Sequence, residues 1–280
     1  MKKLNKIKDL KLMANTLRQQ VIKMTYEAGS GHPGGSLGMA DVFTALYFNY
    51  ANLDPKKPNW ENRDRIILSN GHICPIQYSA MAEAGFFPVK ELLTFRKIGS
   101  RLQGHPHNKS LPGIENSSGQ LGQGLSIACG MALARNLDRK KYRVFCLMSD
   151  GEHDEGETWE AILFAAKNKL KIVSLIDRNG IQLSGFTEKI MPLKSLAEKY
   201  DAFGWKTIDI DGNDIGKILE ALRDAEKISG PVAIICQTMM GRGVSFMQDN
   251  YEWHGKAPNR EEADRALREL EVWRREIERE

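Results

Sequence analysis

The sequence predicts an α/β fold in which a mostly parallel β-sheet forms the middle of three layers and helices cover both of its faces. Short, nearly continuous apolar segments alternate with longer segments in which apolar residues recur at helical spacing. Most of the apolar segments stop at Gly, Asn or Asp, which is typical of strands that end in turns. The chain has 280 residues, 41% of them hydrophobic, with no evident repeat or linker. We therefore expect one domain over residues 1–280.

The N-terminal half is predicted to be mainly helical. Five apolar residues recur at helical spacing in residues 4–28, and Gly29-Ser30-Gly31 then ends the helix: Leu10, Met13, Leu17, Val21 and Met24. The segment DRIILS (64–69) precedes Asn70-Gly71, which predicts a buried strand followed by a turn. The other segments expected here are helices at 37–50, 75–84, 89–96 and 121–137 and a loop at 99–119.

The C-terminal half shows the regular alternation of strand and helix that predicts parallel pairing. The predicted strands are 142–148, 171–177, 205–210 and 231–238. The predicted helices are 157–169, 193–203, 214–228 and a charged, solvated one at 260–280. In open α/β sheets ligands bind beyond the carboxyl ends of the strands, and the conspicuous polar and glycine residues of this chain lie there. That distribution indicates an enzyme, although turns also favour these residue types for local reasons.

Composition and charge narrow the function classes. The net charge is +4, and the N-terminal lysines are not interleaved with aromatic residues, so we expect no nucleic-acid partner and interpret them as one solvated helix face. No segment reaches the roughly 18 consecutive apolar residues of a membrane-spanning helix, and no secretory signal is evident. The four cysteines have no metal-type spacing and are predicted to be buried thiols. We expect a cytoplasmic protein that does not bind membranes.

Asp150 and Asn179 form the most informative pair in the chain. Each follows one of two consecutive predicted strands, and a right-handed crossover would bring both to one edge of the sheet. Carboxylate and amide oxygens suit Mg²⁺ or Ca²⁺, and the backbone carbonyl of Ile181 is a candidate third ligand. Gly151 would let a phosphate approach the backbone. Taken separately, Asp150 is explained by an Asx turn and Asn179 by the turn glycine that follows it. Taken together at this spacing, they predict a cation bound to a phosphate.

Motifs along nearly the whole chain carry a resemblance to a known family. Ser149-Asp150-Gly151 followed by Asn179 resembles the thiamine-diphosphate fingerprint, with Ser149 in place of its first glycine. The segment GETWEAILFAAKNKLKIVSLIDRNGIQLSG resembles transketolase. Other segments resemble the same family and occur in the same order: SGHPGGSLGMADVFTALYF, SNGH, QGHP, GQLGQGLS and GRGVSFMQDNYEWHGKAPN. The resemblance implies the diphosphate-binding domain of the thiamine-diphosphate-binding fold.

The resemblance assigns roles to the histidines. It places His72 and His254 against the cofactor diphosphate and His32 and His105 at the substrate hydroxyls, with His32, His105 and His254 as the catalytic set. Imidazole suits these tasks because it exchanges a proton near neutral pH. The remaining two histidines, His107 and His153, do not match and are expected to be exposed. The HPH sequence at 105–107 could suggest zinc, but no third ligand is in view.

The resemblance also assigns other site residues. Gly119 and Leu121 would pack on the aminopyrimidine, while Gly151 and Glu152 would lie at the cofactor. GQLGQG does not follow a convincing strand, which argues against a dinucleotide site. Glu155 matches a subunit contact, although an acid at a helix N-terminus is equally explained by the helix dipole. The implied cofactors are thiamine diphosphate and Mg²⁺, or Ca²⁺ or Mn²⁺ in its place.

The resemblance covers only the first of the three domains of a full-length transketolase. We therefore expect the N-terminal subunit of a split transketolase, active only with a C-terminal subunit in a two-plus-two assembly. The reaction implied is transfer of a two-carbon ketol unit from a ketose phosphate to an aldose phosphate, in the pentose phosphate pathway or a specialised route. Two alternatives stay open: the alpha subunit of the decarboxylating component of a 2-oxo acid dehydrogenase, and a noncatalytic binding subunit that keeps the fold.

Overall fold

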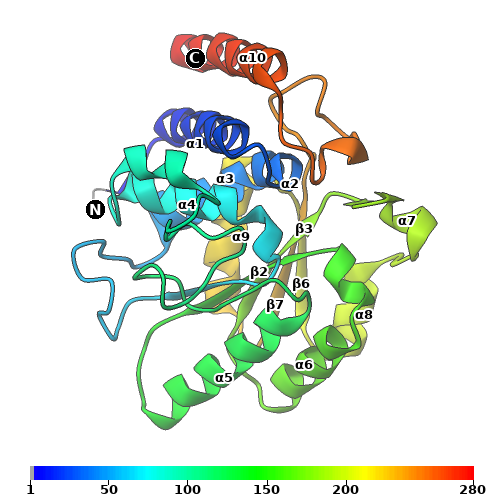
Figure 1. Cartoon of the computed structure of the whole chain (residues 1–280). Coiled ribbons are helices and arrows are strands. Elements are labelled where there is room, and N and C mark those ends of the chain that lie inside the picture. The colour runs from blue at the N-terminus through cyan, green and yellow to red at the C-terminus, as the bar shows by residue number, and fades with distance from the viewer. Residues whose placement is uncertain (1–2) are drawn as a thin grey trace.

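The computed structural model describes residues 3–280 and contains a five-stranded parallel sheet in the order β1-β2-β3-β7-β6 (Figure 1). All of its neighbouring strands pair in parallel. The strands are β1 (Arg65–Leu68), β2 (Val144–Ser149), β3 (Val173–Arg178), β7 (Val232–Gln237) and β6 (Lys206–Asp211). The predicted α/β fold is confirmed, and each of the five predicted strands is found to within about two residues at either end.

Successive side chains of the strands enter two different cores, because alternate residues of a strand point to opposite faces. In β1, Ile66 and Leu68 belong to the larger core and Ile67 to the smaller one. In β2, Phe145 and Cys146 divide in the same way. The inner strands are therefore covered on both faces, which explains their mostly hydrophobic sequences, whereas the edge strand β6 keeps polar residues such as Lys206 exposed.

Each face of the sheet is covered by its own set of helices, which gives the three layers visible in Figure 1. The smaller core lies under α5 (Gln123–Leu137), α6 (Gly156–Lys167) and α8 (Leu196–Ala202). The larger core lies under α1 (Ile7–Ala28), α2 (Pro33–Gly38), α3 (Ala40–Ala45), α4 (Cys74–Ala84) and α9 (Ile215–Lys227).

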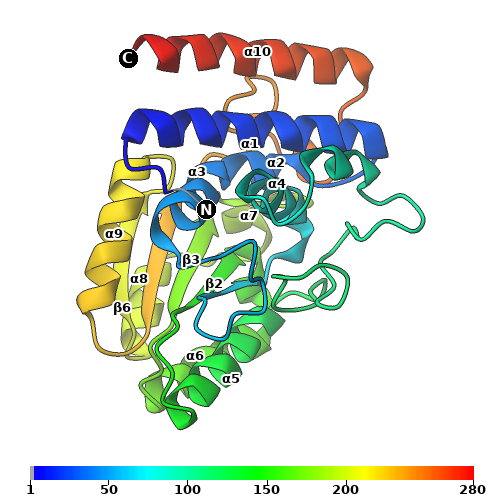
Figure 2. The same ribbon diagram turned by 90° about the vertical axis from the view of Figure 1, so that its left-hand side faces the viewer.

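A further helix, α10 (Arg260–Arg279), lies along α1, on the outside of the helices that cover the larger core (Figure 2). A capping box at Asn259 starts it. Its apolar stripe buries Ala266 and Leu270 against the core, and the side chain of Asn15 donates a hydrogen bond to the Leu270 carbonyl at 2.9 Å. The sequence-based expectation of a solvated helix therefore holds for its outer face only.

Several predicted elements differ in detail. The helix expected at 37–50 begins earlier, at Pro33, and divides into α2, α3 and the π-helical turn η1 (Leu46–Tyr50). The helix expected at 89–96 is the 3-10 helix η3 (Val89–Thr94). A small hairpin of β4 (Ile181–Gln182) and β5 (Gly185–Phe186), followed by α7 (Thr187–Ile190), was not predicted. Two-residue strands carry too little periodicity to be read from sequence.

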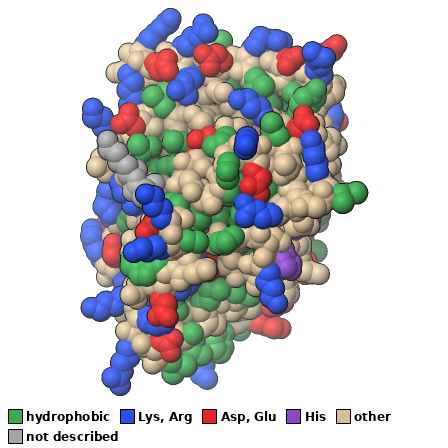
Figure 3. Space-filling model, turned by 60° about the vertical axis from the view of Figure 1, so that its left-hand side comes forward, with side chains coloured by type: hydrophobic (Ala, Val, Ile, Leu, Met, Phe, Trp, Pro, Cys, Tyr) green, Lys and Arg blue, Asp and Glu red, His purple; other side chains and the backbone are tan. Residues whose placement is uncertain are grey.

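The distribution of surface charge and the burial of the cysteines agree with the expectations from the sequence. On the face shown in Figure 3, Lys and Arg side chains are interspersed with Asp and Glu rather than gathered in one patch. All four cysteines are buried thiols, as predicted: Cys74, Cys129, Cys146 and Cys236. Within residues 3–280, no helix is both long and apolar enough to cross a membrane.

Candidate functional site

A cavity of about 290 Å³ opens at the carboxyl edge of the sheet, where the sequence predicted the site. It contains residues that lie far apart in the sequence but follow neighbouring strands. Its lining consists of His32, His72, Gly119, Leu121, Ser149, Asp150, Gly151, Asn179, Ile181, Gln182, Leu183 and His254. Nine of these twelve residues were predicted from the sequence, and the structure brings those nine together.

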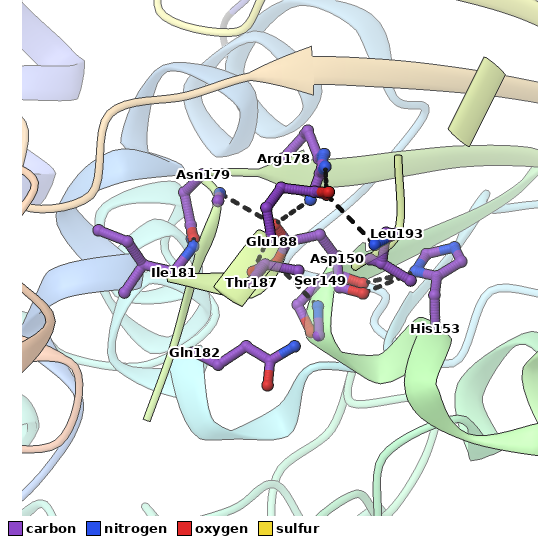
Figure 4. A network of polar contacts seen from close by, with 12 residues as sticks. Ser149, Asp150, His153, Arg178, Asn179, Ile181, Gln182, Thr187, Glu188 and Leu193 are labelled. Carbon is purple, nitrogen blue, oxygen red and sulfur yellow. Dashed lines mark hydrogen bonds and ion pairs between the residues drawn. The ribbon is translucent and has the colours of Figure 1, made fainter. Parts of the chain in front are cut away.

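Asp150 lies directly after β2 and is almost completely buried. Its Oδ1 accepts a hydrogen bond from the Gly151 N–H at 2.7 Å. Its Oδ2 accepts from the Arg178 guanidinium at 2.9 Å and from the Gly180 N–H at 2.9 Å (Figure 4). Thr187 contributes a longer contact to the same oxygen, at 3.3 Å. Burial raises the pKa of this carboxyl group, although the charge of Arg178 and these hydrogen bonds oppose the effect.

Asn179 forms an Asx turn, which the sequence left open for Asp150 instead. Its Oδ1 accepts a hydrogen bond from the Ile181 N–H at 2.9 Å, and its Nδ2 donates to Asp177 at 3.0 Å. The turn does not exclude a ligand role, because an amide oxygen has a second lone pair. Oδ1 of Asp150 likewise has a single donor. Two hard oxygens that can each accept one more contact, lining one cavity with Ile181, fit Mg²⁺ or Ca²⁺.

Such a cation would be held largely by neutral oxygens. Among residues 3–280, no group of three or more His, Cys, Asp or Glu side chains is arranged to hold a metal ion. Asp177 precedes Asn179 by two residues and could add a carboxylate, but burial raises its pKa to about 7, and it bonds Asn179 and Thr238. This set of donors resembles a magnesium site completed by phosphate and water more than a closed protein cage.

The four predicted histidines form one group. The ring centroids of His72 and His254 lie 5.1 Å apart, and that of His32 lies 5.3 Å from His72 and 5.8 Å from His254. His105 lies 6.3 Å from His32 at the exposed side of the group. The first three line the cavity, whereas His105 stands beside it. Four separate segments supply these side chains, so only the fold brings them together.

Burial keeps these imidazoles neutral. It lowers the pKa of His32 to about 4, and the charges of His254, Arg96 and His105 act in the same direction. The pKa of His72 is also well below its usual value for the same main reason. Burial lowers the pKa of His105, with Arg96 as the second cause. Neutral rings have one donor and one acceptor nitrogen, which suits contacts with hydroxyl groups and phosphate oxygens.

The Nδ1 atom of His32 is buried and has no hydrogen-bond partner within the part of the chain that the structure describes. His32 is the residue before α2, and Pro33 starts that helix. A buried polar atom without a partner is costly, and because this nitrogen is closed off, a ligand in the cavity would meet the other parts of the His32 ring.

Besides His105, two predicted residues do not line the cavity. Glu152 is fully buried behind the loop, and burial raises the pKa of its carboxyl group to about 8. Its absence from the lining argues against direct cofactor contact. Glu155 is exposed at the start of α6, and its side chain makes no capping hydrogen bond. That exposure leaves it available for a subunit contact, which stays a prediction.

One prediction about the histidines was wrong. His153 was expected to be exposed but is 2% exposed, and its ring lies between the loop after β2 and α8. Burial lowers its pKa to about 4. Sequence gave no sign of this, because the hydrogen-bond partner Tyr200 lies on a distant helix. His107 is exposed, as expected.

The sequence missed three residues of the lining and the group that holds Asp150. Ser149 had been noted only as a departure from glycine, and Gln182 and Leu183 follow Asn179 without a distinctive pattern. The Arg178 guanidinium also donates to Glu188 of α7, at 2.6 Å. Arginine directly before Asn179, in a segment that follows a buried strand, was the one available signal for this contact.

Comparison with known proteins identifies the family of this chain. Residues 10–276 match the family model described as transketolase, thiamine diphosphate binding domain. The chain belongs to the transketolase family. This confirms the resemblance found in the sequence and the thiamine-diphosphate-binding character of the fold, and it disfavours the 2-oxo acid dehydrogenase alternative.

Transketolase relatives of two lengths match this chain. It is 38% identical to the 6-deoxy-6-sulfo-D-fructose transketolase subunit of Clostridium sp. (strain MSTE9), covering 94% of this chain and 96% of that protein. It is 39% identical to human transketolase, but covers only 42% of it. The crystal structure of Campylobacter jejuni transketolase superposes with a TM-score of 0.89 at 32% identity, over 96% of this chain and 43% of that one. The chain thus spans less than half of the longer transketolases.

Proposed function

We propose that this chain is the thiamine-diphosphate-binding subunit of a two-chain transketolase. With a second subunit it transfers a two-carbon ketol unit from a ketose phosphate to an aldose phosphate. The observation that carries the proposal is the single cavity lined by Asp150, Asn179 and three neutral histidines, in a chain of the transketolase family. The relatives of matching length support the two-chain arrangement, because they are named as transketolase subunits.

In this proposal the carboxyl edge of the sheet holds the cofactor diphosphate through a cation. Asp150 and Asn179 supply side-chain oxygens and Ile181 a backbone carbonyl to Mg²⁺, with Ca²⁺ or Mn²⁺ as substitutes. Gly151 lets the diphosphate approach the backbone. His72 and His254 donate hydrogen bonds to the diphosphate, and Gly119 and Leu121 pack against the aminopyrimidine.

His32 and His105 serve the sugar. Thiamine diphosphate, when bound, would supply the nucleophilic thiazolium carbon that ketol transfer requires. The His32 ring, which lines the cavity, and the exposed ring of His105 can bond the hydroxyl groups of the substrate and accept or return a proton. Because their pKa values lie below the ordinary histidine value, both rings are neutral at pH 7 and can act as bases.

The remaining components come from outside this domain. We propose that residues 1–280 form one diphosphate-binding domain and that a C-terminal transketolase subunit supplies the aminopyrimidine half of the site. The exposed Glu155 lies at the contact between subunits in a two-plus-two assembly. We place the protein in the cytoplasm, in the pentose phosphate pathway or a specialised catabolic route. Two relatives are named for 6-deoxy-6-sulfo-D-fructose and apulose 4-phosphate, so those ketoses belong in a substrate panel.

The test combines binding with reconstitution. Calorimetry with thiamine diphosphate and MgCl₂ should show weak binding to the purified chain, and ketol transfer should appear only after a C-terminal transketolase subunit is added. Asp150→Asn should reduce cofactor affinity by at least about tenfold, because the metal loses its carboxylate ligand. A reconstituted Asp150→Asn complex with full activity would contradict the assignment and favour the noncatalytic alternative.

A further inference from the structure

The imidazole of His153 joins the loop after β2 to a helix that takes no part in the cavity. Its Nδ1 lies 2.9 Å from the Ser149 carbonyl oxygen and 3.2 Å from that of Asp150 (Figure 4). Its Nε2 lies 2.9 Å from the Tyr200 hydroxyl on α8. Both carbonyls belong to residues that line the cavity, whereas the ring itself faces the core.

These partners determine which nitrogen carries the hydrogen. Carbonyl oxygens only accept, so Nδ1 must be the donor, shared between Ser149 and Asp150. In the neutral ring Nε2 then accepts from the Tyr200 hydroxyl. Each polar atom of the ring is therefore used: the two carbonyls set the tautomer, and the Tyr200 hydroxyl satisfies the acceptor that this tautomer leaves at Nε2.

Aromatic packing holds the imidazole in place. The ring centroids of Trp159 on α6 and Tyr200 on α8 lie 5.6 Å and 5.7 Å from that of His153. The Trp159 indole N–H donates to the His153 carbonyl at 2.8 Å. The orientation of the ring is thus set from two helices, and the ring in turn constrains the two residues at the end of β2.

We propose that His153 and Tyr200 are positioning residues for the cation and diphosphate site. They fix the backbone at Ser149 and Asp150 so that the Asp150 carboxylate faces the cavity. This inference rests on the proposed function, since it concerns the affinity of the same site. A metal-binding side chain whose backbone is loosely held binds a cation more weakly. The loss of one supporting hydrogen bond commonly lowers the affinity by a factor of about ten or more.

The test compares two substitutions at His153. His153→Leu fills a similar volume without a donor, whereas the side-chain amide of Asn in His153→Asn can place a donor near the position of Nδ1. The full chain is titrated with thiamine diphosphate at a fixed MgCl₂ concentration by calorimetry, and the thermal midpoint is recorded without ligand. We expect His153→Leu to weaken cofactor binding about tenfold and His153→Asn to restore most of that loss.

Tyr142→Phe provides the matched control. The Tyr142 hydroxyl donates to the Met131 carbonyl at 2.9 Å and packs in the same core, but it does not reach the cavity. Its removal should lower the thermal midpoint without changing cofactor affinity. Tyr200→Phe should lower both the thermal midpoint and the cofactor affinity, since Nε2 of His153 loses its donor.

The outcomes separate this inference from the proposed function. Affinity within twofold of wild type in His153→Leu, or an equal affinity loss in Tyr142→Phe, would overturn the positioning role alone. If His153→Leu does not fold, Tyr200→Phe decides: a loss of threefold or more supports the inference, and parity overturns it. A wild-type chain that binds no thiamine diphosphate, alone or with a second subunit, would refute the proposed function and this inference with it.

Discussion

Replacement of Arg178 by Met should destabilise the chain without ligand more than the chain with ligand. The Arg178 guanidinium lies 2.9 Å from Oδ2 of Asp150, and the two side chains are 13% and 1% exposed. Met keeps most of the aliphatic volume and removes the charge. The buried Asp150 carboxylate then loses its one cationic side-chain partner among the described residues.

The size of the effect follows from what remains around Asp150. Removing one partner of a buried ion pair usually costs about 3–5 kcal/mol. Asp150 keeps the N–H groups of Gly151 and Gly180 and the contact with Thr187, so we expect a cost at or just below the lower end of that range, about 2–3 kcal/mol. For a chain of this size that corresponds to a Tm lower by roughly 5–10 °C.

The assay is thermal unfolding with and without saturating MgCl₂ and thiamine diphosphate. A divalent cation at Asp150 would replace the lost positive charge, so the difference between variant and wild type should shrink by about half or more when both ligands are present. Arg101→Met is the control, because Arg101 forms an ion pair of similar length with Glu91, at 2.8 Å, but at the surface. That control should change stability by less than about 1 kcal/mol.

A defect in Arg178→Met that is unchanged by the ligands would show that the cation does not reach Asp150. A defect as small as that of Arg101→Met would show that the buried pair contributes nothing to stability. Either result would refute the reasoning about this carboxylate.

Two further predictions concern charge elsewhere in the chain. NMR titration of His105 should give a pKa below the ordinary histidine value, and Arg96→Met should raise it, because removing a nearby cation favours the imidazolium form; an unchanged value would exclude Arg96 as a cause. Arg18 pairs with Asp41 at 2.5 Å, with side chains 1% and 7% exposed, so Arg18→Met should cost about 3–5 kcal/mol in urea unfolding. A cost below about 1 kcal/mol would contradict the view that Asp41 depends on this partner.

Much of the fold could be predicted because its signals are local. The continuous apolar strands and the helical periodicity of residues such as Leu10 and Leu17 are present in the sequence itself. The hairpin at 181–186 was missed because strands of two residues have no readable period. The start of α2 at Pro33 was missed because its six residues are dominated by glycine and serine, which do not indicate a helix.

The residues of the candidate site also fall into those that the sequence could predict and those that it could not. Asp150 and Asn179 could be predicted because each directly follows a strand, and parallel strands joined by one crossover end at the same edge. The partners of Asp150 could not be predicted in full. Thr187 contacts Asp150, and Glu188 contacts its partner Arg178, from the start of α7 after the unpredicted hairpin, so their positions depend on a turn geometry that the sequence does not encode in any periodic form.

The sequence by itself determined the chain's family, the positions of its strands and the residue types at the candidate site, because motifs and strand ends are set by neighbours along the chain. Only the tertiary structure decided which charges and hydrogen bonds those residues experience. His153 is the clearest case: it resembles a surface loop residue until α8 brings Tyr200 to its Nε2. Burial and long-range pairing depend on distances between segments far apart in sequence, and those distances exist only in the folded chain.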